Sequence, residues 1–245
     1  MNNENISYVL SSISIFFYSI VYVPQFIVMY KTNSSDGLSI WTILSWTQAD
    51  VLSLISNILL YMPVSITLIG WYHYFIGILM TIAVLYFNKN NTFNIYFSTS
   101  LFLIINTIVT IILQIIIDKS YDSIGLTLSW IIMPIYIIGR IPQIILNYKR
   151  KNTKGLSLLM YIFTILGNSF YLSVITFDPI YVDSNIPWIV SSVINIILDF
   201  VVIFQKYYYK YLFRIKNILR EHTSREHTRE HTREHNTDCE ITIAQ

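Results

Sequence analysis

Three side chains that are charged at neutral pH lie deep inside long apolar stretches of this sequence: Asp50, Arg140 and Asp199. An aspartate at the centre of a membrane helix costs about 2.5–3.5 kcal/mol by insertion scales, so we expect it to face a wet cavity, pair with a base or bind a proton. Each arrangement is typical of a transport pathway. The alternative is a structural ion pair in which Arg140 neutralises one of the two carboxylates.

The chain contains an internal duplication. Residues 22–39 read YVPQFIVMYKTNSSDGLS and residues 140–157 read RIPQIILNYKRKNTKGLS, one template displaced by 118 positions without a gap. The matches include Pro24 and Gln25 with Pro142 and Gln143, and Gly37 to Ser39 with Gly155 to Ser157. The ordered set of matches indicates two copies of one structural unit.

Each Pro-Gln pair is a candidate hinge. Proline inside a helix removes one hydrogen-bond donor and clashes with the carbonyl four residues earlier, which weakens that turn. The glutamine amide could bond the freed carbonyl or meet a ligand. A single proline in a membrane helix usually only kinks that helix. Two prolines at equivalent positions of two repeats favour a cavity that opens alternately to either side of the membrane. We therefore predict hinges at Pro24-Gln25 and Pro142-Gln143.

The two copies differ at one polar position. Asn168 occupies the place in the second copy that Asp50 has in the first. One half therefore offers a charge and the other a neutral amide, and acidic residues in the cavity favour a cationic substrate. A carboxyl group there could also take a proton from an acidic compartment and release it to a neutral cytosol. We predict substrate or proton coupling at Asp50, Asn168, Asp199 and Arg140.

Composition places the chain in a membrane. Hydrophobic residues make up 54% of its 245 residues and charged residues only 12%, whereas soluble domains have about 25% charged residues. Apolar runs long enough to cross a hydrocarbon core of about 30 Å lie at residues 7–30, 40–62, 68–87, 95–117, 125–148, 157–177 and 187–209. This predicts an all-α, multi-pass membrane protein with seven transmembrane helices.

The seven predicted spans form two repeats of three spans each, with one linker span between them. Because the repeats begin four spans apart, both enter the membrane in the same sense, as parallel repeats joined by a linker helix. The predicted segments are a short lumenal N-terminus (1–6), the first repeat (7–87), the linker helix with its loops (88–124), the second repeat (125–213) and a disordered tail of REHT repeats (214–245).

Loop charges predict the orientation. Lysine and arginine gather in the loops on one side of the membrane and after the last span, while only Lys119 lies in a loop on the other side. Cytoplasmic loops carry the excess of basic residues, so we expect a lumenal N-terminus and a cytosolic C-terminus. The sequence contains no decisive sorting signal.

With its duplicated Pro-Gln and downstream GLS on seven spans, the chain resembles the PQ-loop repeat family. Residues 139–168 and 185–205 are most similar to its lysosomal and vacuolar cationic amino-acid transporter branch, and the cystinosin branch fits less well. The corresponding positions are Ala49-Asp50, Arg140 to Gln143, Gly167-Asn168 and Asp199. The resemblance implies export of lysine, arginine or related cations from an acidic lysosome or vacuole to the cytosol by alternating access.

Other functions remain open at this point. The alternatives are an exporter of cystine or another amino acid, and a nutrient-sensing scaffold with a cytosolic partner on the basic loop 149–154 or the tail. The parallel duplication argues against a G-protein-coupled receptor. No hydrolytic or redox constellation is present, so we expect neither an enzyme nor a cofactor or metal site. The expected contacts are a cationic amino acid, protons and the lipid bilayer, with no nucleic acid.

Overall fold

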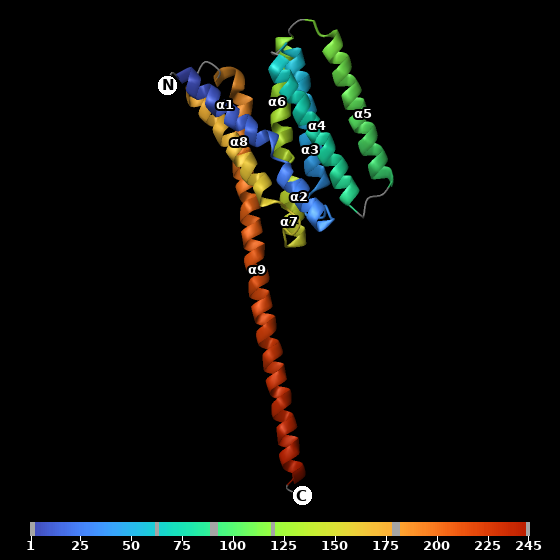
Figure 1. Ribbon diagram of the computed structural model, residues 1–245, viewed down its shortest axis with the longest axis vertical. Coiled ribbons are helices and arrows are strands. Elements are labelled where there is room, and N and C mark those ends of the chain that lie inside the picture. Colours follow the sequence, from blue (N-terminus) through green and yellow to red (C-terminus); the bar gives the residue numbers. More distant parts are fainter. Residues whose placement is uncertain (1–2, 62–63, 89–92, 119–120, 178–181, 244–245) are drawn as a thin grey trace. The chain divides into compact units, whose positions relative to one another are not determined.

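The computed structural model describes residues 3–61, 64–88, 93–118, 121–177 and 182–243. The secondary structure of these residues is helical (Figure 1). The helices are α1 (Asn3–Ser19), α2 (Val23–Thr32), α3 (Ile40–Leu59), α4 (Val64–Phe87), α5 (Phe93–Ile116), α6 (Asp122–Ile138), α7 (Ile141–Arg150), α8 (Leu158–Phe177) and α9 (Val182–Ile243). By its contacts the chain divides into two units, residues 1–205 and 206–245. The all-α fold class is confirmed.

The first and fifth predicted spans are each broken into two helices. The chain leaves α1 at Ser19 and enters α2 at Val23, and it leaves α6 at Ile138 and enters α7 at Ile141. Each proline is the second residue of the helix that follows the break. The prediction of a proline within one continuous helix was therefore wrong.

The break follows from the chemistry of proline. Proline has no N–H and is tolerated in the first turn of a helix, where no intrahelical acceptor is needed. Pro24 has no N–H to donate to the Ile20 carbonyl. This carbonyl instead accepts a hydrogen bond from the N–H of Val23 at 3.1 Å. A short turn then connects the two helices.

Most of the described helices are suited to a bilayer. Five segments are long and apolar enough to cross a membrane: Asn5–Thr32, Thr67–Phe87, Ser98–Ile116, Asp122–Arg150 and Ile186–Asn217. The helix Leu158–Val174 is apolar but shorter. The remaining predicted span forms α3, which carries Gln48 and Asp50 and falls outside this set. The protein is a multi-pass membrane protein.

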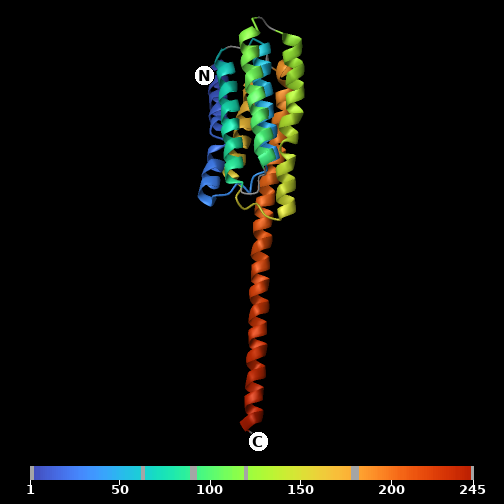
Figure 2. The same ribbon diagram turned by 90° about the vertical axis from the view of Figure 1, so that its right-hand side faces the viewer.

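The two repeats interlock within residues 1–205. The first helix of each repeat packs against the second helix of the other, α1 on α8 and α6 on α3. Ser14 Oγ donates to the Gly167 carbonyl at 2.8 Å, and Ser56 Oγ donates to the Gly125 carbonyl at 2.9 Å. Small residues at such contacts let helix backbones approach closely. In Figure 1, α1 runs along α8 and α6 runs along α3, with the two pairs inclined to each other, an inclination that the view in Figure 2 does not show.

The C-terminal segment is helical in the structure, where α9 continues to Ile243. The disorder predicted for residues 214–245 stays a prediction. The segment contains neither glycine nor proline before that residue, and its REHT repeats place Glu and Arg three or four positions apart, as in Glu221 and Arg225. Such pairs favour a helix.

Candidate functional site

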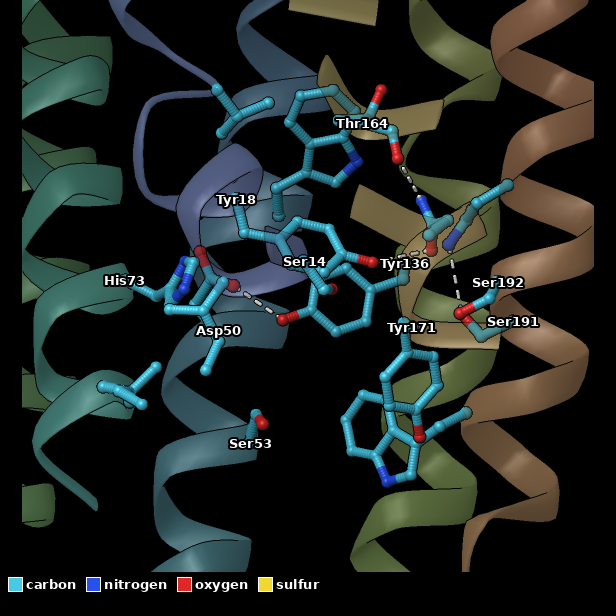
Figure 3. A pocket seen from close by; sticks show the side chains of 18 of the residues that line it. Ser14, Tyr18, Asp50, Ser53, His73, Tyr136, Thr164, Tyr171, Ser191 and Ser192 are labelled. Atoms are coloured by element: carbon cyan, nitrogen blue, oxygen red, sulfur yellow. Dashed lines mark hydrogen bonds between the residues drawn. The ribbon is translucent and has the colours of Figure 1, made fainter. Parts of the chain in front are cut away.

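A cavity of about 560 Å³ lies between the helices of residues 1–205. Its wall runs from Ser11 on α1 to Val21 in the turn that follows, and from Trp46 to Asn57 on α3. The cavity therefore extends from the helix breaks toward the end that carries the N-terminus. Figure 3 shows polar side chains from both repeats pointing into it. Beyond the breaks the interior is filled by a hydrophobic cluster that includes Met29, Leu38, Met80, Leu156, Met160 and Val202.

Of the four residues for which the sequence predicted substrate or proton coupling, Asp50, Asn168 and Arg140 line this cavity. Asp199 does not line it. Its side chain is fully buried and holds Arg140 by two contacts, Nε to Oδ1 at 2.6 Å and the NH2 nitrogen to Oδ2 at 3.2 Å. Thr164 donates to the same carboxylate at 2.7 Å. This is the structural ion pair that we considered as the alternative for one aspartate.

Asp50 and Asn168 occupy equivalent sites in the two repeats. The Tyr136 hydroxyl donates to Asp50 Oδ1 at 2.6 Å, and the Tyr18 hydroxyl donates to Asn168 Oδ1 at 2.9 Å. Tyr18 and Tyr136 are themselves 118 positions apart, as are Asp50 and Asn168. The same bond is therefore built twice, once to a carboxylate and once to an amide.

The cavity has an unbalanced charge. Arg140 and Asp199 form the ion pair found in the described part of the chain, and Asp50 is not a member of it. The hydrogen bond from Tyr136 stabilises the Asp50 carboxylate but adds no positive charge. When Asp50 is ionised, the wall therefore presents one negative charge outside the Arg140–Asp199 pair, which suits a cation.

Two buried polar atoms on the wall have no partner. Trp46 Nε1 and Asn195 Oδ1 make no hydrogen bond, although each residue is only 5% exposed. Arg140 lies over the Trp46 ring at 5.0 Å. A buried donor or acceptor without a partner costs about 1–3 kcal/mol. One buried donor and one buried acceptor beside the cavity therefore have no hydrogen-bond partner in the described structure.

Several wall residues were missed at the sequence level. Tyr18 and Tyr136 could have been found, because they repeat with the spacing of the Pro-Gln pairs. His73 could also have been found, since it is the one histidine of five inside an apolar run. Figure 3 shows it beside Asp50. Trp46 carried no comparable signal.

The two glutamines of the Pro-Gln pairs join the repeats to each other. Gln25 accepts the N–H of Ser157 at 2.7 Å and donates to the Gly155 carbonyl at 3.0 Å. Gln143 accepts the N–H of Ser39 at 2.7 Å and donates to the Gly37 carbonyl at 2.9 Å. Each GLS segment is therefore held by the glutamine of the other repeat.

The two GLS segments also touch directly. A Cβ placed on Gly37 would lie 2.3 Å from the carbonyl carbon of Gly155, so no larger residue fits there. Gly155 has φ +84°, a conformation that favours glycine. This contact explains why both copies of the motif keep glycine.

The chain matches known proteins over both repeats. The family model for the PQ loop repeat matches residues 6–66 and 124–179. The lysosomal amino acid transporter 1 homolog of Homo sapiens is 26% identical over 220 residues, covering 75% of this chain and 76% of that protein.

Two yeast relatives match over shorter stretches. The vacuolar lysine transporter of Saccharomyces cerevisiae is 44% identical over 62 residues, 24% of this chain and 20% of that protein. The vacuolar arginine/histidine antiporter of the same organism is 45% identical over 60 residues, 24% of this chain and 19% of that protein. These relatives are named as transporters, not enzymes. With residues 6–66 and 124–179 both matched by the PQ loop repeat model, the chain contains two PQ-loop repeats.

Proposed function

We propose that the protein transports cationic amino acids of the lysine and arginine class. The observation that carries this proposal is the charge of the cavity, where Arg140 and Asp199 neutralise each other and Asp50 is left to attract a cation. Lysine and arginine carry one net positive charge at neutral pH. A bound molecule would therefore restore neutrality in a place where an unbalanced charge is costly.

The remaining polar groups suit the other parts of an amino acid. The N–H of Trp46 would bind a carboxylate oxygen, and Asn195 Oδ1 would accept from an ammonium group. Asn168 on the opposite wall offers its amide, already aligned by Tyr18. In this arrangement Asp50 selects the charge of the side chain, and the amide and indole groups hold the part common to all amino acids.

The route of transport is export from an acidic lysosome or vacuole to the cytosol by alternating access. The names of the relatives support the compartment, and the loop charges support a lumenal N-terminus. The cavity in its present form extends toward the N-terminal end and would load from the lumen. Opening on the other side requires the Gln25 and Gln143 contacts to separate, with the breaks before Pro24 and Pro142 as hinges.

Transport of radiolabelled substrates tests this proposal. The full chain in liposomes should move arginine and lysine and should not move glutamine, because glutamine lacks the positive side chain. Cystine is included because a cystine exporter is the same-class alternative. If cystine is moved and arginine and lysine are not, the cationic assignment is overturned. If none is moved while a cytosolic partner binds in a substrate-dependent manner, the scaffold alternative replaces transport.

A further inference from the structure

The two contacts between a glutamine and a GLS segment differ in what supports them. At the segments they are alike, because each glutamine accepts a serine N–H and donates to a glycine carbonyl. Behind Gln143 a chain of amides continues. Its Nε2 atom also donates to Asn147 Oδ1 at 3.0 Å, and Asn147 Nδ2 donates to Gln205 Oε1 at 2.9 Å. Gln205 Nε2 in turn donates to the Ile144 carbonyl at 3.1 Å.

This chain of amides fastens Gln143 to α9. Gln143 and Asn147 lie on α7 and are 0% and 1% exposed, while Gln205 lies on α9. A buried amide with several partners resists rotation, because each broken bond leaves an unpaired polar group. Gln143 is therefore held in the orientation that binds the first GLS segment, Gly37 to Ser39.

The first repeat has an apolar residue in place of Asn147. Met29 stands 118 positions earlier and lies fully buried in the hydrophobic cluster. Its thioether is only a weak hydrogen-bond acceptor. In the described structure, the Gln25 side chain bonds only the GLS segment of the second repeat, Gly155 to Ser157. The orientation of the Gln25 amide therefore depends on that contact.

The loop that carries the first GLS segment has two further anchors. Ser35 Oγ donates to the Val84 carbonyl on α4 at 2.8 Å, and Arg150 at the end of α7 donates to the Asp36 carbonyl. Both bonds join this loop to neighbouring helices. They add to the support that the loop receives from Gln143.

We propose that Asn147 is a positioning residue that fastens the Gln143 contact, so that the Gln25 contact opens first when the cavity changes sides. The inference rests on the proposed function, because it gives an order to the two contacts that must separate for release to the cytosol. The second GLS segment leaves Gln25 while the first is still held by Gln143. The two repeats thus have unequal parts in the gate.

Hydrogen–deuterium exchange of backbone N–H groups tests this order, because a protected N–H exchanges when its bond opens. The reporters are the buried N–H groups of Ser39 and Ser157, which Gln143 and Gln25 accept. The full chain in lipid nanodiscs is analysed by mass spectrometry of peptides that cover each GLS segment. The two segments have the same three residues, so a difference in exchange reports a difference in protection. We expect residues 155–157 to exchange several-fold faster than residues 37–39.

Asn147→Met gives the second repeat the residue of the first. It should raise exchange at residues 37–39 toward the rate at residues 155–157 and leave the latter unchanged. Gln205→Met breaks the same chain of amides from α9 and serves as a second variant if the first does not fold. The matched control is Met29→Leu, a volume-conserving change at the equivalent position, which should leave both segments at their wild-type rates.

The outcomes are distinct. Equal exchange of the two segments in the wild type overturns the inference and leaves the proposed function intact. Wild-type exchange at residues 37–39 in Asn147→Met or Gln205→Met overturns the role of Asn147 in the same way. Lysine transport by the same wild-type chain in liposomes is measured separately, and its absence overturns the proposed function whatever the exchange rates.

Discussion

At the scale of single residues, the difference between the two repeats is a change of one functional group. Tyr136 bonds a carboxylate on Asp50, and Tyr18 bonds an amide on Asn168 in the equivalent place. Arg140 stands where the first repeat has Tyr22, so its bond to Asp199 exists once. The two repeats therefore share the same fold, but their charged side chains differ.

The Arg140–Asp199 pair gives a prediction about stability. Asp199→Asn should destabilise the protein by about 3–5 kcal/mol, because it leaves the guanidinium buried without its counter-charge. Arg140→Gln should cost a similar amount, and the double variant should lose less than the sum of the two. Thermal unfolding in detergent measures this, with exposed Asp118→Asn as the control. Single variants that unfold at the same temperature as the wild type would contradict a structural role for the pair.

The sequence was informative at this scale, but incompletely. The cost of charge in a membrane identified Asp50, Asp199 and Arg140. It could not show which aspartate Arg140 neutralises, because that depends on how helices from different repeats pack. It also did not single out Trp46, whose unpartnered N–H is visible only once the cavity exists.

At the scale of helices, the two Pro-Gln pairs begin new helices and do not kink continuous ones. Each proline lies in a first turn, and each following glutamine reaches the GLS segment of the other repeat. Hydropathy predicted the spans at 7–30 and 125–148 but could not resolve the breaks, since both halves are apolar. The bonds of the glutamines are long-range contacts, which a local pattern does not encode.

The breaks give a prediction about turnover. Pro142→Ala should slow substrate exchange more than it weakens binding, because alanine allows α6 and α7 to fuse across the hinge. The matched control is Pro134→Ala, which removes a proline from within α6 and leaves the break in place. Exchange rates and arginine affinity are compared for both variants. Normal exchange by Pro142→Ala would remove the hinge from the mechanism.

At the scale of the whole molecule, duplication and membrane insertion were predictable from composition and from the 118-residue displacement. The interlocking of the repeats was not, because α1 packs on α8 and α6 on α3 across the duplication. This arrangement builds each wall of the cavity from both repeats, with α1 and α8 on one side and α3 and α6 on the other. A movement of one repeat against the other would therefore change the cavity as a whole.

Counterflow of radiolabelled lysine into liposomes loaded with unlabelled lysine tests the central claim most directly. The wild type should exchange lysine, and Asp50→Asn should lose most of that exchange, because the cavity then offers no charge to the cation. Asp118→Asn, outside the cavity, should exchange lysine like the wild type. Lysine exchange by Asp50→Asn at the wild-type rate would contradict the claim that Asp50 binds the transported cation.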